Sequence, residues 1–194
     1  MTPKARSSAS HGPAEPTDAA LLAEVAAGDL GALGALFDRH VGPVRRVLLR
    51  LGARPADVDD LTQATFLDVV HAAASYDGRP SARSWLVGLA VIQVRRRRRS
   101  LARLAGWMSA WAREPAPHVE TPEHLAERQE LAARARTALG GLSQKKREVF
   151  VLVALEGLSG PEVAELLGIP VATVWTRLHH ARTELRASLG EEDR

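Results

Sequence analysis

SGPEVAELLGIPVATVWTRLHHAR, which spans residues 159–182, predicts two short helices joined by a tight turn. Ser159 can cap the first helix, and Glu162, three residues later, completes a capping box. Gly168 supplies the left-handed residue that ends a helix, and Pro170 cannot continue it. A third amphipathic helix precedes this pair, beginning near Leu142. The arrangement is typical of a DNA-binding helix-turn-helix.

The second helix of the pair has an apolar face and a polar, basic face. Its apolar residues recur every three or four positions and are expected to face the core: Val171, Val174, Leu178, Ala181 and Leu185. The residues expected to point outward are Ala172, Thr173, Trp175, Thr176, Arg177, His179, His180 and Arg182. Small and polar side chains near a helix N-terminus can reach base edges while basic ones hold phosphates. The alternative is an ordinary helical hairpin with a solvated basic face.

The composition favours an all-α fold, because aromatic residues make up only 4% of the 194 residues and Ala, Leu, Val and Arg dominate. There is no cysteine, which excludes disulfides and thiolate metal sites, and the seven histidines lack metal-ligand spacing. We find no catalytic grouping and no phosphate-binding glycine loop, so we expect neither enzymatic activity nor a cofactor. No apolar run approaches the roughly 20 residues that cross a bilayer, which predicts a cytoplasmic protein without membrane insertion.

The net charge of +3 conceals a segregation of charge along the chain. Between Ala56 and Asp77 there are five aspartates and no lysine or arginine. From Gly78 to Arg113 there is no acidic residue, and arginines occupy every position of 95–99. Adjacent segments of opposite sign suggest two different partners, and an arginine run on a helix can hold a phosphate backbone. A solvated helix end is the alternative interpretation of the arginines.

Proline and glycine positions divide the chain into two small helical domains joined by a flexible linker. The expected segments are a disordered tail (1–17), a first helical domain (18–104), a linker (105–121), a helix-turn-helix domain (122–189) and an acidic tail (190–194). The first domain is expected to begin with one helix over Leu21–Arg39, weakened by three glycines. Trp107 and Trp111, before the linker's prolines, are expected to pack on the first domain or to enter a groove of a partner.

Pro55 opens the acidic helix of the first domain. One face of that helix is apolar and carries Val58, Leu61, Thr65 and Val69. Another face is expected to be free for a partner and carries Asp57, Asp60, Gln63, Ala64 and Leu67.

Three motifs, in this order along the chain, resemble those of the extracytoplasmic-function (ECF) subfamily of sigma-70 family RNA polymerase sigma factors. DVDDLTQATFL, residues 57–67, resembles their core-binding motif, and SWLVGLA, residues 84–90, resembles the start of their promoter-melting helix. REV at 147–149, EGLS at 156–159 and TVWTRLHHAR at 173–182 resemble their second DNA-binding domain.

The resemblance implies a transcription initiation factor that binds core RNA polymerase and promoter DNA and catalyses nothing itself; an anti-sigma factor is a further expected partner. It implies core-polymerase contacts at Asp57, Asp59, Asp60, Gln63 and Phe66. It implies contacts to the minus-10 element and its backbone at Trp85, Arg95, Arg96, Arg97, Arg98 and Arg99. The outward residues of the last helix listed above would read the minus-35 element.

The sequence departs from the family pattern at four positions. Ala64 stands where the family usually has Glu, Ile92 and Arg96 where it commonly has Asn and Asp, and Trp175 where Lys or Arg is frequent. Two other functions stay open at this level. One is a stand-alone helix-turn-helix regulator that binds its site without polymerase. The other is a sigma-like decoy that occupies an anti-sigma protein and touches no DNA.

Overall fold

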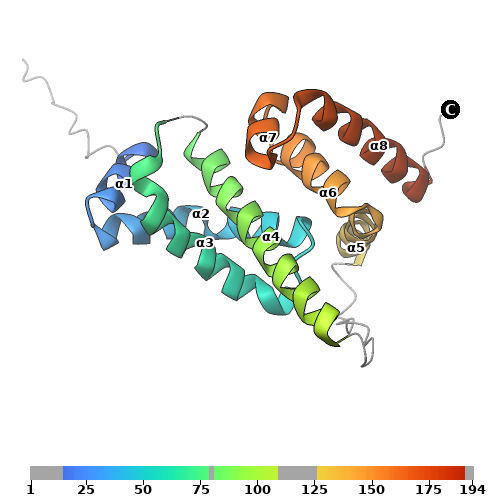
Figure 1. The fold of residues 1–194 in the computed structure, drawn as a ribbon, viewed down its shortest axis with the longest axis horizontal. Coiled ribbons are helices and arrows are strands. Elements are labelled where there is room, and N and C mark those ends of the chain that lie inside the picture. Colours follow the sequence, from blue (N-terminus) through green and yellow to red (C-terminus); the bar gives the residue numbers. More distant parts are fainter. Residues whose placement is uncertain (1–14, 79–80, 109–125, 191–194) are drawn as a thin grey trace, which may run out of the picture.

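The computed structural model describes residues 15–78, 81–108 and 126–190, and within these ranges every regular element is a helix (Figure 1). The first half contains α1 (Asp18–Ala26), α2 (Leu30–Arg50), a 3₁₀ turn (Pro55–Asp57), α3 (Val58–Ala72), a second 3₁₀ turn (Ala73–Ser75) and α4 (Ala82–Met108). The second half contains α5 (Ala126–Gly141), α6 (Gln144–Phe150), which continues as a π-helical turn (Val151–Leu155), α7 (Gly160–Leu167) and α8 (Val171–Leu189). The all-α prediction is confirmed.

The expectation of a single helix over Leu21–Arg39 is wrong, because this segment forms two helices, α1 and α2. Gly28 adopts a left-handed φ of 96°, which an L side chain rarely tolerates. Asp29 then caps α2, since its carboxylate accepts hydrogen bonds from the backbone N–H groups of Gly31 (2.7 Å) and Ala32 (3.3 Å). The rest of α2 is continuous across Pro43 to Arg50.

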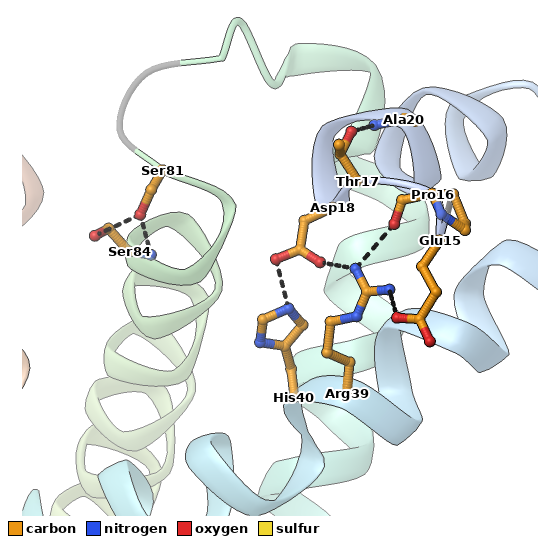
Figure 2. Close-up of polar contacts among 9 residues, drawn as sticks. All are labelled: Glu15, Pro16, Thr17, Asp18, Ala20, Arg39, His40, Ser81 and Ser84. Carbon is orange, nitrogen blue, oxygen red and sulfur yellow. Dashed lines mark hydrogen bonds and ion pairs between the residues drawn. The ribbon is translucent and has the colours of Figure 1, made fainter. Parts of the chain in front are cut away.

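A carboxylate joins the first two helices (Figure 2). Asp18 accepts a hydrogen bond from Arg39 and lies 2.8 Å from the Nε2 atom of the nearly buried His40. Burial raises the pKa of Asp18, but the hydrogen bonds from Arg39 and His40 outweigh that effect and hold it below its usual range. Helix α1 is therefore tied to α2 by charge as well as by apolar packing.

The apolar face that the sequence predicts for α3 packs against α2 and α4. Val58, Leu61, Thr65 and Val69 are all buried. The hydroxyl of Thr65 donates to the carbonyl of Leu61 (2.7 Å), so this polar atom is satisfied inside the core.

The predicted cap, turn and helix pair over residues 159–182 are confirmed. The Ser159 side chain accepts from the Glu162 N–H while the Glu162 carboxylate accepts from the Ser159 N–H (2.7 Å), and Gly168 ends α7 with a φ of 66°. Four of the five expected core residues of α8 are buried. Val171 is the exception, because it lies at the first position of the helix and 38% of its surface is exposed.

The two halves of the molecule pack on each other, with α4 and the C-terminal end of α2 facing the second half (Figure 1). One cluster of buried apolar residues continues from Leu21 in α1 to Leu178 in α8. Leu166 of α7 lies directly over Gly88 of α4, where an added Cβ would be 2.9 Å from its Cδ1 atom. Helix α4 extends past the expected domain end at residue 104 to Met108; Trp111 and most of the expected linker lie outside the described residues.

Buried glutamates of the second half meet arginines of the first at this boundary. Glu148 of α6 accepts a forked pair of hydrogen bonds from Arg95 of α4, the shortest at 2.7 Å. Glu156, whose side chain is almost fully buried, accepts from Arg50 (2.6 Å) and Arg83 (3.0 Å). These charge-assisted hydrogen bonds connect the two halves at two separate places, one at Glu148 and one at Glu156.

Candidate polymerase and nucleic-acid interfaces

The outer face of α3 carries an acidic and amide surface next to an apolar patch. Asp59, Asp60 and Gln63 are exposed, and Asp59 forms an ion pair with Arg45 of α2. Leu67, one turn beyond Gln63, is 55% exposed. A contiguous apolar patch with a polar, acidic rim is typical of a protein-binding surface.

This surface borders a groove of about 410 Å³ between α2 and α3. Its apolar lining comprises Leu33, Phe37, Val41, Phe66 and Leu67, with Asp59 and Gln63 among the polar lining residues. Phe66 is only 5% exposed and packs edge-on against Phe37, with the ring centroids 4.8 Å apart. It therefore helps to form the groove and offers little of its own surface.

The α2 residues of this groove are not among the sites expected from the sequence. Leu33, Phe37 and Val41 are four residues apart, so they form one stripe along a helix. That spacing is the signal by which they could have been found. Their stripe lies beside the buried face of α2 and is only partly covered by α3.

The expectation that Asp57 lies on a face free for a partner is wrong. Asp57 is buried at the start of α3, where its carboxylate accepts hydrogen bonds from Arg54 (2.7 and 3.0 Å) and from Arg97 (2.7 Å). The hydrogen bond from Arg54, helped by Arg97 and opposed by burial, holds the pKa of Asp57 below its usual range. In this structure Asp57 joins α3 to α4.

Three of the five consecutive arginines of α4 are engaged within the molecule. Arg95 pairs with Glu148, Arg96 with Asp68 (2.9 Å) and Arg97 with Asp57. The acidic and basic segments thus neutralise each other in part, because α3 and α4 pack side by side. Arg98 and Arg99 are exposed and have no acidic partner among the described residues, so they are the arginines of the run most available to an outside anion.

Trp85 is half-buried near the start of α4 and packs against Tyr76, with ring centroids 5.5 Å apart. It also lines a cavity of about 200 Å³ between α4 and α7, together with Ile92 and Leu166. In this arrangement Trp85, which the family resemblance assigns to the minus-10 element, and Ile92, which replaces the common Asn, face the second half of the molecule.

The outward face of α8 carries the residues expected there. Ala172, Trp175, Thr176, His179, His180 and Arg182 are exposed, while Thr173 and Arg177 are half-buried. The two histidine rings lie 5.7 Å apart, and the Thr176 hydroxyl donates to the carbonyl of Ala172 (3.0 Å). The face has no acidic residue from Ala172 to Thr183, so its charge suits a polyanion.

Within the described residues there is no group of three or more His, Asp or Glu side chains that could hold a metal ion. Nor does any described helix have the length and apolarity to cross a membrane.

Comparison with known proteins matches both halves of the chain to one family. Residues 36–104 match the model for sigma-70 region 2, and residues 132–185 match the model for sigma-70 region 4. The RNA polymerase sigma factor CnrH of Cupriavidus metallidurans is 35% identical over 182 residues, which cover 90% of this chain and 95% of CnrH. The ECF RNA polymerase sigma factor SigE of Mycolicibacterium smegmatis is 33% identical over 91% of this chain and 69% of SigE.

Solved structures agree with these matches. CnrH in complex with the cytosolic domain of CnrY aligns with a TM-score of 0.64 and 32% identity, over 91% of this chain and 99% of CnrH. The sigma factor RpoE of Bartonella quintana, solved with the anti-sigma factor NepR, shares the fold at a TM-score of 0.67 and 21% identity, over 83% of this chain and 98% of that one. The chain contains sigma-70 regions 2 and 4 in this order, and its relatives match over most of their length. Sigma factors of this kind are promoter-recognising initiation factors and not enzymes. These matches show that the chain belongs to the ECF subfamily of RNA polymerase sigma factors.

Proposed function

We propose that this sigma factor uses three separate surfaces, one to bind core RNA polymerase and two to recognise the promoter. The α3 face and the adjoining α2–α3 groove bind core RNA polymerase, the arginine run of α4 holds DNA at the minus-10 element, and the outward face of α8 reads the minus-35 element. The observation that carries this division is the separation of surface chemistry: the face of α3 is acidic and apolar, whereas the outward face of α8 over residues 172–183 is basic and has no acidic residue.

The polymerase surface is proposed to combine a charged rim with an apolar anchor. Asp59, Asp60 and Gln63 form the rim, and Phe37 and Leu67, which are 39% and 55% exposed, provide the anchor. Interfaces of this kind take most of their affinity from a few desolvated apolar side chains, while the charges orient the partner. The usual family glutamate is Ala64 here and half-buried, so Asp60 and Gln63 carry more of the polar contact.

This docking surface is tested with Asp60→Arg/Gln63→Ala. Both side chains are exposed, so the variant is expected to keep its fold while losing co-purification with core RNA polymerase. Glu24→Arg, an exposed charge reversal on α1, is the matched control and should bind core like the wild type. Wild-type recovery of core with the double variant would show that polymerase docks elsewhere.

For the minus-10 element, we propose that Arg98 and Arg99 hold the DNA backbone first. Arg95, Arg96 and Arg97 join them only when their carboxylate partners release them, because each is ion-paired in the free protein. Ile92 lacks the hydrogen-bonding side chain that Asn would offer an extruded base. Base discrimination at minus-10 is therefore weaker, and recognition depends more on backbone contacts and on Trp85.

For the minus-35 element, Arg177 is the proposed base-edge contact of α8. It is half-buried, so its long side chain is partly fixed before DNA binds. Replacing Arg177 with alanine is expected to cost about 1 to 3 kcal/mol of binding free energy and to relax preference at one base pair. Unchanged selection from a randomised minus-35 library would refute this role.

We further propose cytoplasmic localisation and control by an anti-sigma factor. Two similar sigma factors have been solved with protein partners, the cytosolic domain of CnrY and the anti-sigma factor NepR. An inhibitor that covers the α2–α3 groove would compete with polymerase for the same apolar anchor. Leu67→Asp should then weaken both complexes, whereas loss of only one would separate the two surfaces.

A pull-down from a bacterial lysate also distinguishes the two other functions. A stand-alone regulator would bind its DNA site without core polymerase, and a decoy would recover an anti-sigma protein and bind no promoter. Arg98 and Arg99, exposed without acidic partners among the described residues, favour DNA binding over the decoy. The apolar groove beside α3 favours a protein partner over the stand-alone regulator.

A further inference from the structure

Trp175 is held against the start of the preceding helix by a contact that only glycine permits. Gly160 is the first residue of α7 and is buried. A Cβ placed on Gly160 would lie 2.4 Å from Cζ2, 2.9 Å from Cε2 and 3.1 Å from Cη2 of Trp175. The six-membered ring of the indole therefore rests directly on the backbone of Gly160.

The support beneath the indole is itself rigid. The reciprocal capping bonds between Ser159 and Glu162 fix the backbone on both sides of Gly160. These hydrogen bonds outweigh burial and hold the pKa of Glu162 below its usual range. On the other side, the buried Val174 anchors α8 next to Trp175. The ring is thus fixed by α7 before any DNA is bound.

Half of the surface of Trp175 nevertheless remains in water. Its neighbours one turn away on the same face are Ala172 and His179, and no acidic side chain intervenes. An indole carries no charge and donates only one hydrogen bond, so it contributes nothing to counterion release. What it offers a major groove is a preset apolar surface, and the apolar group that distinguishes bases there is the thymine methyl.

We propose that Trp175 is a specificity-determining residue that selects a thymine methyl in the minus-35 element, and that Gly160 is its positioning residue. This inference rests on the proposed reading of minus-35 DNA by α8. It adds that the group recognised is a thymine methyl and that Gly160 holds the Trp175 indole in position. Ordering a side chain in advance lowers the entropy cost of binding, so a fixed indole discriminates better than a mobile one.

The test uses holoenzyme made with the full chain and a minus-35 duplex selected from a randomised library. Each thymine of the selected element is replaced in turn by deoxyuridine, which removes only the methyl group. At one position the wild type should bind about fourfold more weakly, as expected for one lost buried methyl. Holoenzyme with Trp175→Ala should bind the two duplexes equally.

Gly160→Ala tests the positioning role, because the added methyl displaces the indole. This variant should lose the preference for thymine over deoxyuridine, and Gly160→Ala/Trp175→Ala should behave like Trp175→Ala alone. Gly141→Ala, where an added Cβ meets no atom within 4 Å, is the matched control and should keep the wild-type preference. If Gly160→Ala unfolds the domain, the double variant restores its thermal stability, since the clash disappears with the ring.

The outcomes separate this inference from the function on which it rests. A selected minus-35 consensus that wild-type holoenzyme binds equally well with thymine or deoxyuridine at every position would overturn the methyl reading. Equal discrimination by wild type and Gly160→Ala would overturn the positioning role. Failure to select any minus-35 consensus, together with no effect of Arg177→Ala, would instead refute the proposed function of α8.

Discussion

Replacing Glu148 with glutamine tests the contact that joins the two halves of the molecule. Glu148 accepts hydrogen bonds from Arg95 of α4 and from the Gln144 side chain (2.9 Å). The substitution keeps the size of the side chain and removes its charge. Arg95 then loses its carboxylate partner, and the new amide group presents a donor where only acceptors were used.

The expected cost follows from the burial of the two partners. The Glu148 side chain is 4% exposed, but that of Arg95 is 34% exposed. Breaking a fully buried ion pair costs about 3 to 5 kcal/mol, whereas a fully exposed one contributes about 0 to 1 kcal/mol. Since Arg95 can turn toward water, we expect a loss of about 2 kcal/mol, or about 4 to 8 °C in Tm for a chain of this size.

The assay is urea and thermal unfolding of the full chain, with small-angle scattering to follow the separation of the halves. Glu184→Gln is the control, because Glu184 pairs with Lys146 within the second half and both partners are partly exposed. It should change stability by about 0.5 kcal/mol or less. If Glu148→Gln matched this control in stability and in radius of gyration, the buried pair would not hold the halves together.

Three further predictions concern charge and backbone geometry. Because Arg54 and Arg97 hold the pKa of Asp57 below 3.8, its contribution to stability is present above about pH 4 and is lost as pH falls through the lowered value. Asp57→Asn should therefore lower stability at neutral pH and weaken the decrease of Tm at acidic pH. The same decrease of Tm in the variant and the wild type would contradict this. Arg98→Ala/Arg99→Ala should reduce the log–log salt slope of promoter binding by about 1.8, at roughly 0.9 per duplex phosphate contact, and an unchanged slope would place the backbone contacts elsewhere. Gly52→Ala should cost about 1 to 3 kcal/mol in urea unfolding, since φ is +90° and the added Cβ would meet the Arg147 guanidinium at 2.1 Å; wild-type stability would refute it.

Features encoded by neighbouring residues were predictable from the sequence. The capping box at Ser159 and the left-handed Gly168 depend on residues within one turn, so their pattern in the chain determines the geometry. The buried face of α3 follows in the same way from helical spacing. The glycine spacing alone does not predict the break at Gly28, because a single glycine is tolerated inside a helix; the residue that marks the break is Asp29, which caps α2.

Features that depend on partners distant in sequence were not predictable. The burial of Asp57 follows from its pairing with Arg97, 40 residues away, and Arg95 is engaged by Glu148, 53 residues away. The charge pattern alone suggested two unpaired surfaces, because it does not reveal which helices pack together. The contact between Trp175 and Gly160 likewise depends on how α7 crosses α8.

One measurement on reconstituted holoenzyme tests most directly whether α3 binds core polymerase and α8 recognises the minus-35 element. Transcription from a selected promoter is compared for the wild type, Asp60→Arg/Gln63→Ala and Arg177→Ala, with binding to core polymerase measured in the same samples. We expect the α3 variant to lose core binding and transcription together. We expect Arg177→Ala to bind core like the wild type but to lose the stimulation that the minus-35 element provides. Loss of core binding by Arg177→Ala, or promoter-specific transcription by the α3 variant at the wild-type level, would show that α3 and α8 do not have these separate roles.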